Sequence, residues 1–153
     1  MRQEKHYIDS IYYQLELTAK YCKYLANTVF QKLKIQISLD EYATLDTLVA
    51  NGQMCQRDLA KLILKDRPST GRILNSLEEK GYINRVADTK NNRLIRKIIL
   101  TEDGKKVLDE ITSKVRGYLE KIQTSFSLEK INELRLSITR FREILENEVE
   151  INI

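Results

Sequence analysis

The sequence predicts a mainly helical fold that carries one small β-hairpin, and three features of the chain predict it. Apolar residues repeat at helical spacing through long stretches near both ends of the 153-residue chain. Residues 56–81 fit two short helices joined by a tight turn. Two β-rich runs around a polar turn follow directly, at residues 82–86 and 94–100. The predicted order is therefore helix–turn–helix and hairpin, with long helices on either side.

Composition limits the classes of protein to which the chain can belong. Its 153 residues suffice for one domain, and a net charge of +4 means that any basic surface must be local. Two cysteines and one histidine argue against a zinc site, and no glycine-rich phosphate loop or nucleophile–base set is present. We therefore expect no enzyme, cofactor or metal. Without an apolar run of membrane length or a signal peptide core, we expect no membrane contact and a cytoplasmic location.

The first predicted helix covers residues 1 to about 33 and carries a repeated apolar seam. The seam residues recur in alternating steps of three and four, which is the pattern of helices that pack on helices. They are Ile8, Ile11, Leu15, Thr18, Cys22, Leu25 and Val29. Several tyrosines widen the seam, and these fit either packing or a pocket for a flat aromatic ligand.

A second helix is predicted from a capping box, in which Ser38 is followed three residues later by Glu41. This helix ends near residues 51–52. Cys55 then lies just before the next helix, where the helix dipole activates a thiol. Cys55 is therefore either a redox switch, helped by its neighbour Arg57, or a short residue that fills a cap position.

The second helix of the helix–turn–helix segment contains three residues that are unfavourable for helix stability alone. Arg67 and Arg72 lie near its N-terminus, where the macrodipole disfavours cations, after an N-cap predicted at Asp66. Gly71 lies inside it, at about 1 kcal/mol less favourable than alanine. These choices fit a helix end that approaches a phosphate backbone, because free N–H groups attract an anion and a missing Cβ permits close approach. The alternative is an ordinary solvated face.

The hairpin that follows favours the first interpretation. A helix–turn–helix followed by a hairpin is a winged helix, whose second helix suits the DNA major groove. The polar turn at residues 88–93 carries Lys90 and Arg93 and would be the tip of the wing. It has no large apolar residue, so we expect little reason for it to fold back onto the core.

Two further helices follow the hairpin, with N-caps predicted at Thr101 and Ser127. Their apolar stripes consist of Val107, Leu108, Ile111, Val115, Tyr118, Leu119 and Ile122, and of Leu128, Ile131, Leu134, Ile138, Phe141, Leu145 and Val149. Together with the first helix, they are more apolar than a small winged helix requires. This surplus predicts a dimer interface.

Three pieces of the sequence together resemble the multiple antibiotic resistance regulator (MarR) family. They are Q-R-D-L-A at 56–60, S-T-G-R-I-L-N-S-L-E-E-K-G-Y-I at 69–83 and L-T-E-D-G at 100–104. The resemblance covers nearly the whole chain. It implies a homodimeric bacterial transcription regulator, more often a repressor, that binds pseudo-palindromic double-stranded DNA.

The resemblance also implies the roles of larger segments. The single domain, residues 1–153, would contain a winged-helix DNA-binding lobe at 38–101 and dimerisation helices at 1–37 and 102–153. The family often binds phenolic or aromatic carboxylate ligands between these parts, and some members sense oxidants through cysteine. The candidates here are Tyr12, Tyr13 and Tyr42 for the ligand and Cys55 for oxidation. Asn92-Arg93-Leu94 replaces the usual Asp-Arg-Arg of the wing, which removes the acidic partner of its internal salt bridge.

Position and chemistry assign residues of the winged helix to DNA. The predicted major-groove contacts are Ser69, Thr70, Arg72, Asn75 and Ser76. The predicted phosphate contacts are Gln56, Arg57, Lys65, Arg67 and Arg85. Lys90 and Arg93 of the wing are predicted to enter or flank the minor groove. The alternative is a winged helix that binds proteins, such as an anti-repressor or scaffold. The basic residues argue against this alternative, and the altered wing argues for it.

Overall fold

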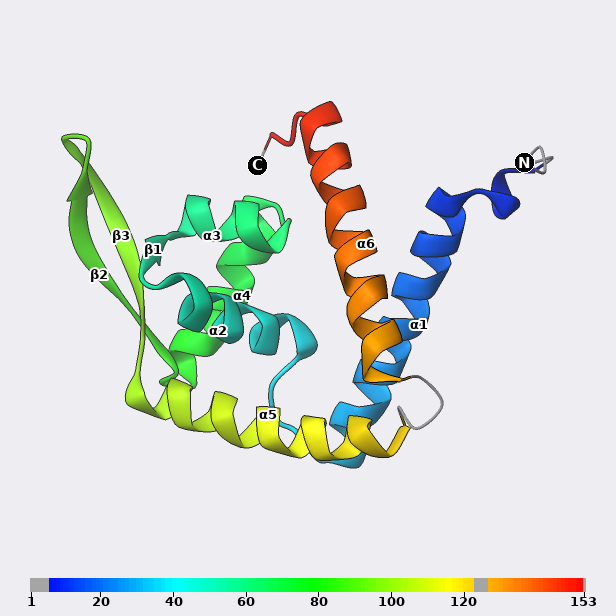
Figure 1. The fold of residues 1–153 in the computed structure, drawn as a ribbon. Coiled ribbons are helices and arrows are strands. Elements are labelled where there is room, and N and C mark those ends of the chain that lie inside the picture. The colour runs from blue at the N-terminus through cyan, green and yellow to red at the C-terminus, as the bar shows by residue number, and fades with distance from the viewer. Residues whose placement is uncertain (1–5, 123–126, 153) are drawn as a thin grey trace. The chain divides into compact units, whose positions relative to one another are not determined.

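The computed structural model of the chain describes residues 6–122 and 127–152, with the side chains of residues 121 and 122 left aside. Within these ranges the chain is mainly helical with a small antiparallel sheet, which confirms the predicted fold class (Figure 1). The helices are η1 (Tyr7–Asp9), α1 (Ile11–Lys32), α2 (Leu39–Asn51), α3 (Gln56–Ile63), α4 (Arg67–Glu79), α5 (Glu102–Ile122) and α6 (Leu128–Glu148). The strands are β1 (Met54–Cys55), β2 (Ile83–Lys90) and β3 (Arg93–Leu100). None of the helices described here is long and apolar enough to span a membrane.

The chain forms two compact units, Met1–Leu39 and Asp40–Ile153. In the first unit, α1 begins at Ile11, so the prediction of a helix from residue 1 is wrong. The reason is Ser10, which adopts an extended backbone and accepts a hydrogen bond from the N–H of Tyr13 at 3.3 Å. A serine N-cap of this kind sets the start of a helix. The first five residues of the predicted helix lie outside the described residues.

The wing is a longer hairpin than the sequence predicts. The strands of the sheet are ordered β1-β3-β2, and β2 pairs with β3 from Ile83 opposite Leu100 to Lys90 opposite Arg93. Only Asn91 and Asn92 form the turn, with φ angles of 51° and 60°. Asparagine tolerates this left-handed region, and a two-residue turn of this kind matches the twist of the paired strands. The hairpin therefore projects as a narrow ribbon beyond the helices of its unit (Figure 1).

The core of the second unit joins the helix–turn–helix to the sheet. Its fully buried large side chains are Leu45, Leu59, Leu74, Leu77, Ile83 and Ile98. They come from α2, α3, α4, β2 and β3, and each of these elements contributes one face to the core. Leu74 and Leu77 repeat at the three-residue spacing that keeps one side of α4 buried. The opposite side of α4 is therefore free of the core.

The L-T-E-D-G piece is a structural joint between the wing and α5. Thr101 is the N-cap of α5, as predicted, because its Oγ1 accepts from the N–H of Gly104 at 3.0 Å. The same hydroxyl donates to the carbonyl of Gly81 at 2.7 Å. A Cβ on Gly104 would lie 2.2 Å from the carbonyl oxygen of Tyr82, so only glycine fits there. This joint fixes the end of β3 and the start of β2 against α5.

Candidate nucleic-acid interface

Helix α4 presents a short exposed face whose start is set by Asp66. The carboxylate of Asp66 accepts a hydrogen bond from the N–H of Ser69 at 2.6 Å, which confirms the predicted N-cap. This hydrogen bond holds the pKa of Asp66 below its ordinary value. Arg72 and Asn75 are exposed, and Ser69 is half-buried between them and the helix start. The three lie at intervals of three residues and therefore line one side of α4.

The guanidinium of Arg72 is already oriented along this face. Its Nη2 donates to Ser69 Oγ at 3.0 Å, one turn closer to the helix N-terminus. The remaining N–H groups keep the planar fork that matches the O6 and N7 acceptors of guanine. Ser69 and Arg72 thus act as one polar unit at the exposed end of α4.

Two of the predicted base contacts face inward. Thr70 is fully buried and its hydroxyl donates to the carbonyl of Asp66 at 2.9 Å, so the prediction that it contacts a base is wrong. Ser76 is half-buried, and its hydroxyl donates to Glu41 at 2.6 Å. Glu41 is 5% exposed and also accepts from Lys80 Nζ at 2.7 Å. Ser76 therefore ties α4 to α2 and is corrected from a base contact to a structural one.

Arg85 also occupies a different place from the predicted one. Its Nε donates to Glu78 at 2.9 Å, and its Nη2 donates to both Glu78 and Asn75 Oδ1, the latter at 2.7 Å. The side chain of Arg85 is only 17% exposed. Because Glu78 matches its charge, Arg85 is poorly placed for the phosphate contact that the sequence predicts. The hydrogen bond from Arg85 also holds the pKa of Glu78 below its ordinary value.

We predict that Glu78→Gln makes the stability of the fold less sensitive to acid. A carboxyl with a lowered pKa stabilises the folded state above its ordinary pKa of 4.5, and this contribution is lost as the pH falls through the lowered value. The variant should therefore be less stable than wild type at neutral pH and lose less on acidification. Urea unfolding between about pH 3 and pH 7 measures this. Glu79→Gln, on the exposed neighbour, is the control, and parallel curves for Glu78→Gln and wild type would contradict the ion pair.

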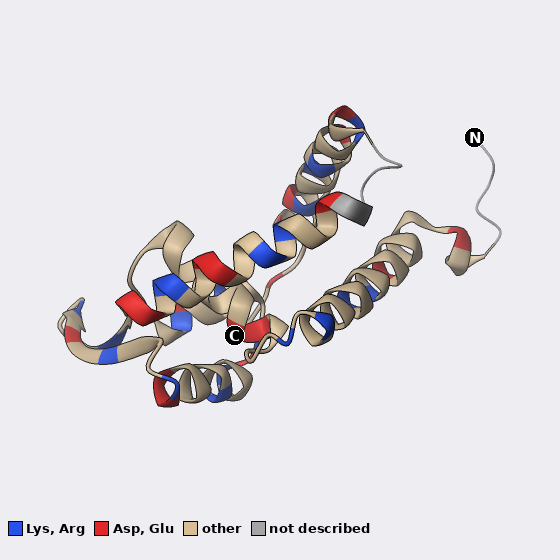
Figure 2. Cartoon of the chain, turned by 90° about the horizontal axis from the view of Figure 1, so that it is seen from below, with Lys and Arg blue, Asp and Glu red and all other residues tan. Residues whose placement is uncertain are grey.

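A basic cleft lies between α3 and the wing. We define it by its five basic lining residues, and its volume is about 700 Å³. These residues are Arg57, Lys61, Lys90, Arg93 and Arg96. Gln56 lines the cleft too, so the structure brings together four predicted DNA contacts from two separate segments. Figure 2 shows Lys and Arg interspersed with Asp and Glu along the helices and the hairpin, so the basic surface is local, as the composition requires.

Two members of the basic cleft, Lys61 and Arg96, are absent from the sequence-based prediction. Lys61 follows Arg57 by four residues, which places both on one side of α3. That spacing was the signal available in the sequence. Arg96 carried no comparable signal, because its position at the cleft depends on how β3 faces α3.

The wing is fastened to α3 by a salt bridge that the sequence did not reveal. Lys90 Nζ lies 2.7 Å from Asp58 Oδ2, so an ion pair between exposed side chains links the wing to the surface of α3. Hydrogen bonds from Lys90 and, next, from the Cys55 thiol hold the pKa of Asp58 below its ordinary value. Within the hairpin, Lys97 and Asp88 lie 3.4 Å apart.

The other predicted phosphate contacts lie close to α3 and α4. Arg57 and Arg67 are exposed. Gln56 Nε2 donates to the carbonyl of Arg67 at 3.3 Å and so links the two helix starts. Lys65 is partly exposed and lies 3.0 Å from Asp40. Arg57 and Arg67 are therefore the residues of this group best placed for an external phosphate.

We predict that Gly71→Ala raises the free energy of unfolding by about 1 kcal/mol, the difference in helix propensity. A Cβ at this position would meet only Gln56 Nε2, at an ordinary contact distance of 3.5 Å. Urea unfolding of the variant and wild type measures the gain. If DNA comes as close to Gly71 as the sequence suggests, the same variant should bind DNA more weakly. An unchanged DNA affinity would contradict that close approach.

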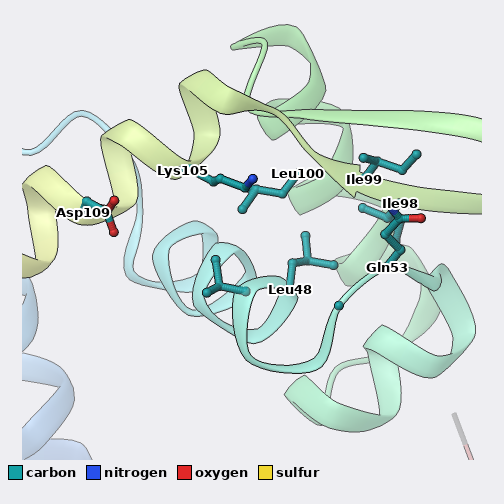
Figure 3. A pocket seen from close by; sticks show the side chains of 9 residues that line it. Leu48, Gln53, Ile98, Ile99, Leu100, Lys105 and Asp109 are labelled. Carbon is teal, nitrogen blue, oxygen red and sulfur yellow. The ribbon is translucent and has the colours of Figure 1, made fainter.

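Two hollows lie away from the exposed face of α4. One, of about 430 Å³, is lined by Tyr42 of α2 together with Thr112, Val115 and Arg116 of α5. The hydroxyl of Tyr42 lies 3.0 Å from Thr112 Oγ1. The other, of about 400 Å³, is mainly apolar, and Figure 3 shows side chains of α2, β3 and α5 around it.

The remaining predicted ligand residues belong to the first unit. Tyr12 is exposed, and the ring of Tyr13 meets that of Tyr7 edge-on with centroids 5.6 Å apart. A cleft that unites Tyr12 and Tyr13 with Tyr42 stays a prediction.

Comparison with known proteins adds a family and several relatives. Residues 37–95 match the model of the MarR family. The chain is 25% identical over 143 residues to YybA of Bacillus subtilis (strain 168), an uncharacterized HTH-type transcriptional regulator. The matched region covers 94% of this chain and 93% of YybA.

Two solved structures share the fold over nearly their whole length. NadR, solved in complex with 4-hydroxyphenylacetate, superposes with a TM-score of 0.71 at 24% identity, covering 92% of this chain and 96% of NadR. The MepR–DNA complex of S. aureus gives a TM-score of 0.68 at 23% identity, covering 92% of this chain and 99% of MepR. The likeness thus extends well beyond the winged helix.

Proposed function

We propose that this chain, whose residues 37–95 match the model of the MarR family, is a transcription regulator that binds double-stranded DNA sequence-specifically, as a homodimer on a pseudo-palindromic site. The observation that carries this proposal is the exposed face of α4, where Ser69, Arg72 and Asn75 present donors from one side of a helix whose other side is buried. A helix with this division enters the major groove and contacts base edges. MepR, which shares the fold, has been solved on DNA.

The basic cleft is the proposed site of backbone contact. Its residues Arg57 and Lys61 come from α3, and Arg93 and Arg96 come from β3, so cations of two elements line one cleft. Contacts of this kind position a protein on the duplex without specifying sequence. Arg67, exposed at the first turn of α4, adds a cation where free backbone N–H groups already favour an anion. Arg93 is the wing residue proposed for the minor groove.

The homodimer is proposed from apolar side chains that the single chain leaves exposed. On α1 and α6 the exposed fractions of these side chains run from 39% to 75%. They are Ile11, Tyr12, Tyr21, Tyr24 and Leu25 of α1, and Leu128 and Leu134 of the predicted apolar stripe of α6. Cys22 of the predicted seam is exposed as well. Soluble monomers rarely leave so much apolar surface in contact with water. Packing against a second copy of the chain would bury this surface.

Repression and release by an effector complete the proposal. A dimer bound across a promoter blocks polymerase, and a DNA-binding regulator acts in the cytoplasm. We propose a small aromatic ligand as effector, because the hollow beside Tyr42 offers a phenol hydroxyl, Thr112 and Arg116 to a phenol or carboxylate. NadR is the relative solved with such a ligand.

Oxidation at Cys55 is the second route to release. Its thiol hydrogen-bonds Asp58, which in turn holds Lys90 of the wing. Adding 4-hydroxyphenylacetate or peroxide to the protein–DNA complex tests both routes, with Cys55→Ser as the control for peroxide. If peroxide releases wild type and Cys55→Ser from DNA equally, Cys55 is not the site of oxidation that causes release.

The first experiment is binding to the DNA upstream of the protein's own gene, titrated across salt concentrations. We expect binding that outcompetes random DNA, with log K falling linearly as log salt rises, because each phosphate contact releases counterions. Weak and equal binding to all duplexes would contradict sequence specificity. No binding to any duplex would favour the alternative function, in which the winged helix contacts other proteins.

A further inference from the structure

Asn75 of α4 and Arg85 of β2 meet on the exposed face of α4. Arg85 Nη2 lies 2.7 Å from Asn75 Oδ1. A guanidinium has only donors, so the amide atom that faces it must be the oxygen. The NH₂ group of Asn75 is therefore the end of the amide directed away from Arg85.

Arg85 is itself held in one orientation. Its Nε donates to Glu78 at 2.9 Å, and Nη2 contacts both Glu78 and Asn75. Glu78 follows Asn75 by one helical turn, so the planar fork spans two neighbouring positions of α4. The side chain of Arg85 is 17% exposed, which limits its freedom to turn outward. A lysine ammonium keeps the charge but lacks this planar fork.

We propose that Arg85 is a positioning residue that makes Asn75 a hydrogen-bond donor toward DNA, so that Asn75 selects a base edge with an acceptor and disfavours cytosine. This inference rests on the proposed function. Adenine N7, guanine N7 and O6, and thymine O4 accept in the major groove, whereas cytosine presents only its N4 amino donor there. A free asparagine amide would turn either end toward the base, but the contact with Arg85 removes that choice.

The competing role for Arg85 is the phosphate contact predicted from the sequence. The two roles differ in what they change. A phosphate contact alters affinity on all sequences and the dependence on salt, whereas a positioning role alters the base preferred at one position of each half-site.

The test is selection of bound duplexes from a pool randomised over roughly two helical turns, about 20 base pairs. Wild type, Asn75→Asp and Arg85→Lys are compared, with Arg140→Lys on α6 as the matched control. Asn75→Asp keeps an oxygen toward Arg85 and turns the outward donor into an acceptor. We expect its preference at one position per half-site to move to cytosine by about tenfold. Arg85→Lys should lose about tenfold of the discrimination against cytosine at that same position.

A salt titration of Arg85→Gln on the wild-type consensus separates the two roles. We expect the slope of log K against log salt to equal that of wild type, because Glu78 already matches the charge of Arg85. A slope shallower by about one per protomer, with an unchanged base profile in Asn75→Asp and Arg85→Lys, would overturn the inference and leave the proposed function intact. A wild-type pool without any enriched sequence would overturn the proposed function and the inference together. Circular dichroism checks folding, and Asn75→Asp alters only an exposed side chain.

Discussion

Arg72→Ala is expected to abolish sequence-specific DNA binding while the protein stays folded. Arg72 is exposed on α4 and its guanidinium donates to Ser69, so its removal leaves no buried group unpaired. A bidentate arginine–guanine pair discriminates by about 1–3 kcal/mol, and a dimer makes the contact twice, so affinity for the specific site should fall roughly 30-fold or more. Fluorescence anisotropy with the selected duplex and with random DNA measures the loss.

The control for Arg72→Ala removes the same charge elsewhere. Arg140 is exposed on α6, on the side away from the predicted apolar stripe of that helix. Arg140→Ala should bind the selected duplex as wild type does. Arg140 is not part of the proposed DNA interface. Equal losses of DNA affinity in Arg72→Ala and Arg140→Ala would therefore mean that Arg72 acts through net charge alone. Wild-type affinity in Arg72→Ala would remove α4 as the recognition helix.

The fold was predictable because its signals are local. Asp66, Pro68 and Gly81 mark the ends of α4 by capping and backbone geometry that involve only neighbouring residues. The buried face of α4 follows from helical spacing. Thr70 belongs to that buried face, and counting it as a base contact as well ignored the same periodicity. The start of α1 was missed because an apolar seam continues through Ser10, whose N-cap is the stronger local signal.

The contacts that arrange the interface were not predictable, because they join residues far apart in the chain. Glu41 and Lys80 are separated by 39 residues, and Asp58 and Lys90 by 32. Neither pair follows from periodicity or from a cap motif, and each charged residue alone is compatible with a solvated surface. Arg85 illustrates the consequence. Its charge suggested a phosphate contact, but Glu78 and Asn75, brought beside it by the α4–β2 turn, give it another use.

The wing carries ion pairs of its own. Asn92 stands where the pattern of the resembling family has an acid, and it forms the tight turn with Asn91. Lys90–Asp58 ties the wing to α3, and Lys97–Asp88 lies within the hairpin. Surface ion pairs of this kind contribute little stability individually.

Leu134→Glu is expected to convert the proposed homodimer into a monomer and to weaken DNA binding by more than about 100-fold. Leu134 is 52% exposed in the single chain and belongs to the apolar stripe of α6. In a dimer interface an unpaired carboxylate would have to be desolvated, which is strongly unfavourable. A monomer also loses the gain in affinity from binding two half-sites together, which commonly amounts to 10²–10⁴-fold, as an order of magnitude.

Asn132→Glu adds the same charge to the opposite side of α6 and is the matched control. Sedimentation equilibrium at low micromolar concentration gives the mass of each variant, and circular dichroism reports whether the helices persist. We expect wild type and Asn132→Glu to sediment as dimers and Leu134→Glu as a helical monomer. A dimeric Leu134→Glu with wild-type DNA affinity would place the interface elsewhere. A wild type that sediments as a monomer and binds one half-site as tightly as the full symmetric site would refute the homodimer, because a homodimer gains affinity by contacting both half-sites together.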